Sequence, residues 1–322
     1  MNILVTRRRR LVSVAFILVI LVAMIFIGIF STEKKSNLDH IKVGYIPITH
    51  CIPLYIAIEK GIFAREGIKV DLIALPGGPK ILEALIVGEV DVGFSNVVSV
   101  ILARSNRIKM LPIAGGAIET NANKDHAILI KKDSAISSAI DLKGKKIAIN
   151  SRQNIDHLMI KAYLDKHALT ESHVNLVEIP FPRMNAALEG GLVDAIATVE
   201  PFITLGFKEY NRKILTHNYI EVRDRTFVTT FAVMERNLQS NPSRYKRFSR
   251  AIKEASKIAN HDADISRSVL PAYTGITPSL AEDVGLPYFS PLPDKTNIIQ
   301  TEEMMITQGF IRQNTDLVSE LE

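Results

Sequence analysis

Apolar and polar residues along most of this chain follow the two patterns that are typical of strands and helices. Short runs rich in Val and Ile, such as residues 41–46 and 68–75, are followed by proline and predict buried strands. Longer segments lie between them, such as residues 53–63, which open with a proline and predict helices. Because strands and helices alternate with short connections, the sequence predicts an α/β fold.

One short pattern occurs twice. Residues 84–94 read ALIVGEVDVGF, and residues 187–197 read ALEGGLVDAIA. In both segments glycine ends a helix and a Val-Asp pair begins an apolar strand. Asp91 and Asp194 begin strands and do not end them, so a structural role at a turn is a better interpretation than ligand contact. The repetition therefore predicts two lobes of similar construction.

The alternation stops after residue 234, where residues 242–260 predict a long amphipathic helix. The chain is expected to leave the first lobe near residue 123 and to return near residue 226. The predicted parts are residues 1–36 as an N-terminal extension, residues 37–123 with 226–322 as lobe 1, and residues 124–225 as lobe 2. Two crossings between lobes would form a hinge beside a cleft, which is a favoured place for a ligand.

The N-terminal extension contains a long apolar run. Residues 11–30 carry no charged side chain, and four arginines at positions 7–10 precede them. A helix of this length spans about 30 Å, the thickness of the hydrocarbon core of a bilayer. The positive-inside rule keeps the arginines in the cytoplasm and places the rest of the chain across the membrane. We expect an uncleaved anchor; a cleaved signal peptide is the alternative, and both place the body outside the cytoplasm.

Charge and cysteine content narrow the classes of function. The formal net charge is +5, but six basic and two acidic residues fall within the first forty positions, so the body is close to neutral. Nucleic acid is not an expected partner, because binding it requires clustered Lys and Arg. The single cysteine, Cys51, allows no intramolecular disulfide and lies too far from the apolar run for lipid attachment.

The loops after the predicted strands are the candidate binding elements, because ligands of open α/β sheets bind beyond the carboxyl ends of strands. These loops are residues 47–51, 76–79, 95–96, 114–116, 150–157 and 199–202. Several of them precede helices, whose N-terminal amides favour anions. Their glycine, hydroxyl and amide residues suit a small oxyanion.

Four segments follow one another along the body: IKVGYIPITHCIPLYIAIEKGIFAREGIKVDL, GG…ILEALIVGEVDVGFSN, DLKGKKIAI and VEPF. In order and spacing they resemble the nitrate/sulfonate/taurine-type substrate-binding proteins of ABC importers, and the resemblance covers nearly all of the chain from Ile41. It implies a type II periplasmic-binding-protein fold. It also implies a monomeric receptor that closes on a small solute and presents it to an ABC permease and its ATPase. No catalytic activity, metal or cofactor is expected in this interpretation.

The resemblance also assigns candidate ligand-binding residues: Thr49, His50, Gly77, Gly78, Ser95, Asn96, Ser151, Arg152, Gln153, Asn154 and Glu200. His50 stands where relatives that bind nitrate or bicarbonate have an acid, and Arg152 and Gln153 lie in a loop that is usually rich in Ser, Gly and Thr. Arg152 is either a partner for a carboxylate or sulfonate or a solvated loop residue. Glu200 either accepts hydrogen bonds from a solute, as in relatives that bind pyrimidines, or is structural. The expected solute is a small anionic or heteroaromatic compound.

An enzyme on the same fold is the main alternative, with Cys51 or His50 as the catalytic residue. The fold family includes a desulfinase with a cysteine nucleophile near the end of its first strand, and pyrimidine-forming enzymes that use histidine. A nucleophilic cysteine needs a base, and neighbours such as His50 and Cys51 on an extended segment point to opposite sides. A buried, inert thiol is therefore the preferred interpretation. Metal binding by His50 and His157 is not expected, because they lack partners at suitable spacing.

Overall fold

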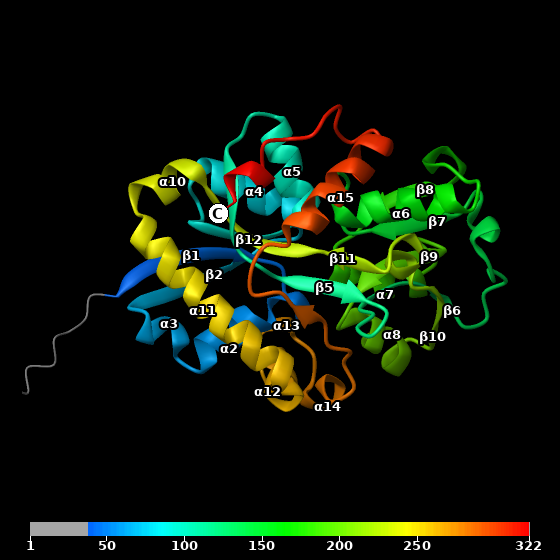
Figure 1. Ribbon diagram of the computed structural model, residues 1–322. Coiled ribbons are helices and arrows are strands. Elements are labelled where there is room, and N and C mark those ends of the chain that lie inside the picture. Colours follow the sequence, from blue (N-terminus) through cyan, green and yellow to red (C-terminus); the bar gives the residue numbers. More distant parts are fainter. Residues whose placement is uncertain (1–37, 322) are drawn as a thin grey trace, which may run out of the picture. The chain divides into compact units, whose positions relative to one another are not determined.

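The computed structural model describes residues 38–321 of the 322-residue chain (Figure 1). The predicted membrane helix at residues 11–30 and the arginines before it lie outside this range. Within residues 38–321, no helix combines the length and the apolar content that are needed to cross a bilayer.

Three β-sheets make up the framework of residues 38–321 (Figure 1). The first sheet has the order β2-β1-β3-β12-β4. Its strands are β1 (Asp39–Tyr45), β2 (Ile68–Ala74), β3 (Val92–Asn96), β4 (Met110–Ala114) and β12 (Thr229–Met234). β1 pairs in parallel with β2 and β3, whereas β12 is antiparallel to β3 and β4.

The second sheet repeats this arrangement. Read from one edge, its order is β8-β7-β9-β6-β10, with β7 parallel to β8 and β9, and β6 antiparallel to β9 and β10. Its strands are β6 (His126–Lys131), β7 (Lys146–Ile149), β8 (Asn175–Glu178), β9 (Ala195–Val199) and β10 (Arg212–Thr216). The duplication that the sequence indicates therefore extends to the topology of both sheets.

A small third sheet, which we call the connecting sheet, lies at the two passages of the chain between the larger sheets. It has the order β11-β5-β13, formed by β5 (Ala117–Thr120), β11 (Arg225–Phe227) and β13 (Tyr288–Phe289). The chain passes from β5 into β6 of the second sheet, and it returns through β11 into β12 of the first sheet. All strands of the second sheet thus fall within residues 124–225.

Helices follow most of the strands. The helices before β11 are α2 (Ile52–Glu59), α3 (Ile62–Arg65), α4 (Gly78–Val87), α5 (Val97–Ser105), α6 (Ile155–Lys166), α7 (Phe181–Glu189), α8 (Phe202–Glu209) and α9 (Asn218–Val222). The later ones are α10 (Glu235–Ser240), α11 (Pro242–His261), α12 (Ala263–Ser268), α13 (Leu270–Thr274), α14 (Pro278–Ala281) and α15 (Lys295–Thr307). Short 3-10 helices are η1 (Thr49–Cys51), η2 (Ala139–Leu142), η3 (Glu171–His173) and η4 (Val318–Glu320).

One helix predicted from the hydrophobic pattern is confirmed by the structure, and another is not. The long amphipathic helix is confirmed as α11, which begins at Pro242 as expected. The single helix predicted at residues 53–63 is wrong, because the structure has two helices, α2 and α3, there. Gly61 separates them with a φ of 63°, a left-handed conformation that glycine adopts at no steric cost.

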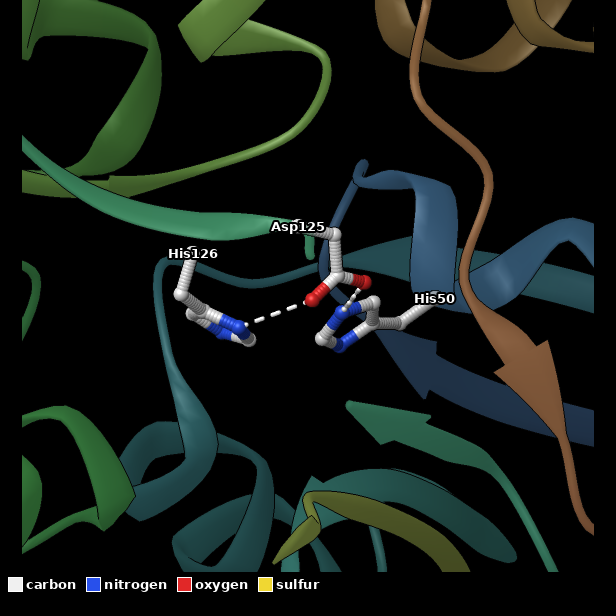
Figure 2. A group of neighbouring side chains, drawn as sticks. All are labelled: His50, Asp125 and His126. Carbon is white, nitrogen blue, oxygen red and sulfur yellow. Dashed lines mark hydrogen bonds and ion pairs between the residues drawn. The ribbon is translucent and has the colours of Figure 1, made fainter. Parts of the chain in front are cut away.

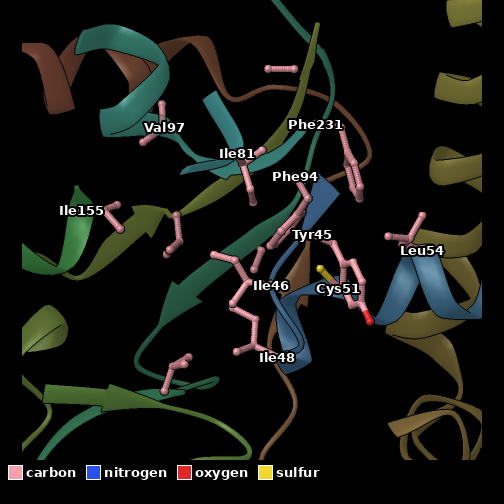
Figure 3. Packing of buried hydrophobic residues seen from close by; sticks show 14 of the residues in the cluster. Tyr45, Ile46, Ile48, Cys51, Leu54, Ile81, Phe94, Val97, Ile155 and Phe231 are labelled. Atoms are coloured by element: carbon pink, nitrogen blue, oxygen red, sulfur yellow. The ribbon is translucent and has the colours of Figure 1, made fainter. Parts of the chain in front are cut away.

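Aromatic residues join the first sheet to α11. The ring centroids of Phe94 on β3 and Phe231 on β12 lie 5.3 Å apart, and Phe231 lies 5.6 Å from Phe248 on α11. All three side chains are fully buried. Figure 3 shows Phe94 and Phe231 in the same apolar layer as Tyr45 and Cys51. Burial of each phenyl ring stabilises the fold by about 2–3 kcal/mol.

The repeated aspartates have the same structural role in both sheets. Asp91 accepts a hydrogen bond from the Lys42 amide at 2.9 Å, and its own amide donates to the Lys42 carbonyl at 2.8 Å. Asp194 makes the equivalent pair with Lys146, at 2.8 Å in both directions. Each aspartate thus holds the start of its strand to the parallel neighbour, which confirms the structural interpretation.

We expect Asp194→Ala to lower the free energy of unfolding by about 1–2 kcal/mol, because the Lys146 amide loses its side-chain acceptor. Asp194→Asn keeps an acceptor oxygen and should cost about half as much or less. Urea denaturation measures both changes, with exposed Asp133→Ala as the control. Equal losses for the alanine and asparagine variants would show that charge, and not the hydrogen bond, holds the strand.

Candidate functional site

Three helices, α4, α5 and α6, begin close to the side chain of Asn96. Asn96 caps α5 by accepting a hydrogen bond from the Ser99 amide at 2.9 Å. The same oxygen accepts from the amide of Ile155, the first residue of α6, at 3.2 Å. The buried Asn96 side chain therefore connects the start of α5, which follows a strand of the first sheet, to the start of α6, which follows a strand of the second sheet. Helix starts carry free amides and a partial positive charge, which favour an anion.

The first residue of α4 completes this group. A Cβ atom on Gly78 would lie 2.8 Å from Ser95 Oγ and 2.9 Å from Ser99 Oγ, and it would collide with the amide nitrogen of Asn96. Gly78 therefore has to be glycine for α4 to begin here. Gly77 faces the second-sheet loop, since a Cβ there would contact Ser151 at 3.5 Å.

Two buried hydroxyls lie beside these helix starts without a hydrogen-bond partner in the described part of the chain. Ser95 and Ser99 are 0% and 1% exposed, and neither Oγ atom has a hydrogen-bond partner among residues 38–321. A buried hydroxyl without a partner costs free energy, so a water molecule or a ligand that reaches it would gain a hydrogen bond. Ser95 was among the candidates that the resemblance assigned, and Ser99 was not, although the Asn-x-x-Ser capping pattern at residues 96–99 could have indicated it.

The predicted second-sheet loop divides into two parts. Asn154 caps α6 by accepting from the His157 amide at 2.9 Å, and Ser151 lies against Gly77. The guanidinium of Arg152 instead pairs with Glu171 at 2.7 Å, and the Gln153 side chain is exposed. The structure therefore brings Ser151 and Asn154 to the helix starts, whereas Arg152 is held by the carboxylate of Glu171, which lies within the same part of the chain, residues 124–225.

A surface hollow of about 200 Å³ lies next to the helix starts. Its lining includes Pro79, Leu82, Glu83, Ser99, Arg152 and Gln153. It therefore connects solvent to the first turns of α4 and α5. Arg152 and Gln153 border this hollow even though they do not contact Asn96.

The loops after β1 and β9 are joined directly. The hydroxyl of Thr49 donates to the Glu200 carbonyl at 3.0 Å. The Glu200 carboxylate accepts from the Thr204 hydroxyl at 2.8 Å and the Thr204 amide at 3.1 Å, and the Gly285 amide lies 3.3 Å away. Burial raises the pKa of Glu200 to about 7 in spite of these donors. Both carboxylate oxygens thus have protein partners.

His50, whose side chain is 1% exposed, belongs to a second polar group, which lies where the chain passes between the sheets. His50 Nε2 lies 2.7 Å from Asp125 Oδ2, and Asp125 Oδ1 lies 2.9 Å from His126 Nδ1. Figure 2 shows the Asp125 carboxylate between the two imidazole rings. Glu119 on β5 also hydrogen-bonds His126 Nδ1. We call His50, Glu119, Asp125 and His126 the His-Asp cluster.

Burial and the neighbouring histidines determine the pKa values of the two carboxyl groups in the His-Asp cluster. Burial raises the pKa of Glu119 to about 8. Burial also acts to raise the pKa of Asp125, but the neighbouring imidazoles of His50 and His126 hold it well below its usual range. The sequence reasoning assigned no binding role to Asp125, His126 or Glu119. The Asp-His doublet at the start of a predicted strand was the available signal.

The surroundings of Cys51 do not activate its thiol. Cys51 is fully buried, and burial raises the pKa of its thiol well above the usual value. The His50 ring pairs with Asp125, and within residues 38–321 no histidine hydrogen-bonds Cys51. Figure 3 shows the sulfur among apolar side chains. These observations support the interpretation of an inert thiol.

The two large sheets have the same topology, and loops from both of them meet at Asn96. This arrangement is that of an α/β periplasmic-binding-protein fold. The chain belongs to the NMT1/THI5-like family, whose model matches residues 48–264. The predicted resemblance to substrate-binding proteins of ABC importers is thereby confirmed.

Named relatives agree with this assignment. A putative aliphatic sulfonates-binding protein of Bacillus subtilis is 28% identical over 207 residues, which are 62% of this chain and 61% of that protein. The chain thus spans about three fifths of the length of this curated relative. Among solved structures, the alkanesulfonate-binding protein SsuA of Xanthomonas axonopodis pv. citri, bound to MOPS, has a TM-score of 0.72 at 20% identity, covering 88% of this chain and 97% of that one. The nitrate-binding protein NrtA of Synechocystis has a TM-score of 0.73 at 14% identity, covering 88% and 85%. At these identities the structures show the fold.

Proposed function

We propose that this protein is the extracytoplasmic solute-binding component of an ABC importer for a small anionic or heteroaromatic compound. The observation that carries the proposal is the meeting of three helix starts at Asn96, beside the free hydroxyls of Ser95 and Ser99. Backbone amides and hydroxyls in this arrangement suit a sulfonate, nitrate or bicarbonate group. The names of the sulfonate-binding and nitrate-binding relatives support the same class of solute.

The proposed mechanism is hinge closure of a type II binding protein. Lobe 1 comprises residues 37–123 and 226–322, lobe 2 comprises residues 124–225, and the connecting sheet is the hinge. Opening would separate Asn96 from Ile155 and Thr49 from Glu200, which exposes the helix starts to solvent. A bound anion that contacts helix starts of both lobes would bind the closed state more tightly and shift the population toward it.

The remaining parts of the proposal concern location and partners. We expect residues 11–30 to anchor the protein, or to be cleaved on export, so that the body works outside the cytoplasm as a monomer. Its partners are the solute, the permease and the ATPase. No catalytic role is proposed for Cys51, whose thiol is buried without a base, or for His50, which pairs with Asp125.

A thermal-shift screen of the purified full-length protein tests the proposal. Nitrate, bicarbonate, alkanesulfonates, taurine and pyrimidines are the solutes to compare. We expect one of these classes to raise the melting temperature in proportion to the logarithm of its concentration. No shift with any of them would count against the proposed function.

The double variant Ser95→Ala, Ser99→Ala is expected to weaken binding of the identified solute about 100-fold. Each lost hydrogen bond to a charged group costs about 1.5 kcal/mol, or tenfold. The solute-free protein should stay as stable as before, because neither hydroxyl has a protein partner. Titration calorimetry measures the affinity, and Ser105→Ala at the exposed end of α5 is the matched control. An unchanged affinity would place the solute elsewhere.

A further inference from the structure

We propose that the His-Asp cluster is a binding site for one divalent transition-metal ion of the zinc class. The ligands are one ring nitrogen each of His50 and His126 and a carboxylate oxygen of Asp125, which lie within 4.8 Å of one another. Glu119 lies beside them, hydrogen-bonded to His126 Nδ1, and a water molecule would complete a four-coordinate site. This inference does not depend on the proposed solute or on the helix starts at Asn96. Metal binding was not expected from the sequence, since only His50 and His157 were considered.

The hydrogen bonds within the cluster leave acceptors without protons. Asp125 and Glu119 both approach the same ring nitrogen, His126 Nδ1. That nitrogen carries at most one proton, which can point toward one acceptor only. Accordingly, Asp125 Oδ1 and Glu119 Oε1 have no hydrogen-bond partner within residues 38–321. A cation bound by Asp125 and the two imidazoles would supply Asp125 with the missing partner.

Hydrogen-bond acceptors without partners are costly in this cluster because it is buried. The side chains of His50, Glu119, Asp125 and His126 are 1%, 0%, 1% and 4% exposed, so water does not compensate for missing partners. The Asp125 carboxylate lies between two imidazoles, and burying a carboxylate charge costs several kcal/mol unless cationic partners offset it. A divalent ion would offset the charge of Asp125 and bind the imidazoles in their neutral form, which is the form in which histidine binds metals.

The geometry needs little adjustment to accept an ion. Metal–ligand bonds of about 2.1 Å in a tetrahedron place the ligand atoms about 3.4 Å apart. Asp125 Oδ2 lies 2.7 Å from His50 Nε2, and Asp125 Oδ1 lies 2.9 Å from His126 Nδ1. To admit an ion, the carboxylate has to turn one oxygen toward it, and the imidazoles have to move outward by roughly half an ångström. The ring of His126 is already held, since it stacks on Tyr219 with centroids 3.8 Å apart and 11° between the planes. The Tyr219 hydroxyl in turn donates to Asp156 at 2.9 Å.

The donor set indicates the class of metal. Two imidazole nitrogens with carboxylate oxygens suit zinc and its divalent neighbours, whereas calcium and magnesium prefer oxygen ligands alone. His50 follows β1 of the first sheet, and His126 is the first residue of β6 in the second sheet. An ion bound here would therefore tie the two sheets together beside the passage of the chain.

Cobalt(II) titration of the chelator-treated full-length protein is the test. We expect one equivalent to bind and to produce the visible absorption of a four-coordinate cobalt site. His50→Gln and His126→Gln should each weaken cobalt binding at least 100-fold. The matched control is His40→Gln, because His40 makes the same kind of pair with Asp71, at 3.0 Å, on the exposed surface. X-ray absorption of the unmodified cobalt protein should show two imidazole ligands, which needs no variant to fold.

Three results would overturn the metal site. They are the absence of stoichiometric cobalt binding, unchanged affinity in both histidine variants, and a cobalt spectrum without imidazole ligands. Each would mean that the cluster is a proton-sharing network only. Thermal shifts with the candidate solutes, measured on the same protein in chelator, separate this outcome from failure of the proposed function.

Discussion

Replacing Gly116 with alanine is expected to lower the free energy of unfolding by about 3 kcal/mol. Gly116 links β4 to β5, where the first sheet meets the connecting sheet. An added Cβ would lie 2.6 Å from Thr229 Oγ1 and 2.7 Å from the Thr229 carbonyl carbon, and it would collide with the carbonyl oxygen. Backbone atoms cannot rotate away as a side chain can, so β12 has to shift. The Thr229 hydroxyl also accepts from the Ala117 amide at 2.9 Å, and the shift would strain this bond.

Urea denaturation of the full-length protein measures the Gly116→Ala effect. Gly190→Ala is the matched control, because Gly190 has a φ of −71° and an added Cβ there meets its nearest neighbour at 3.5 Å. The control should change the free energy of unfolding by less than about 1 kcal/mol. Similar values for both variants would show that β12 and β5 are not held as closely as the structure has them.

Much of the fold follows from local sequence signals. Apolar runs and glycine ends predicted the strands and helices of both large sheets, and the doubled Val-Asp pattern led to the repeated topology. The connecting sheet was not predicted, because β13 has two residues and β11 has three, too few to show a period. Gly61 was taken as part of one helix, although its left-handed conformation divides that helix in two.

The candidate site shows a similar division. The loops that hold Thr49, Gly78, Ser95 and Asn96 were predicted from the general rule that ligands bind beyond the ends of strands, whereas the residues themselves were assigned by the resemblance. The His-Asp cluster was missed because His50 and Asp125 are 75 positions apart and meet only through the passage between the sheets. The cluster thus depends on tertiary topology, which residue spacing does not reveal.

The sequence also could not predict in which direction a long side chain points. Arg152 was a candidate anion partner, yet its guanidinium pairs with Glu171, which lies 19 positions further along the chain. This pairing depends on η3 lying beside the start of α6. The residue type alone therefore left two interpretations open.

Glu200 is expected to make stability fall as the pH rises from about 4.5 to 7. The carboxyl group is 5% exposed, and burial raises its pKa from 4.5 to about 7. Between these values the folded protein keeps a proton that the unfolded chain has released, so raising the pH favours unfolding. The contribution of this group is fully present below about pH 4.5 and is lost by about pH 7, a change of about 3 kcal/mol.

Glu200→Gln isolates this contribution, because glutamine keeps the shape of the protonated acid and does not titrate. The free energy of unfolding of the original protein minus that of the variant should decrease by about 3 kcal/mol between pH 4.5 and 8. Denaturation at several pH values measures the difference, and exposed Glu303→Gln on α15 serves as the control, for which the difference should stay constant. A constant difference for Glu200→Gln as well would mean that donation from Thr204 and Gly285 keeps this carboxylate ionised in the folded protein despite its burial. In that case the loop after β9 would hold a charge beside Thr49, and closure of the two sheets on an anion would have to work against it.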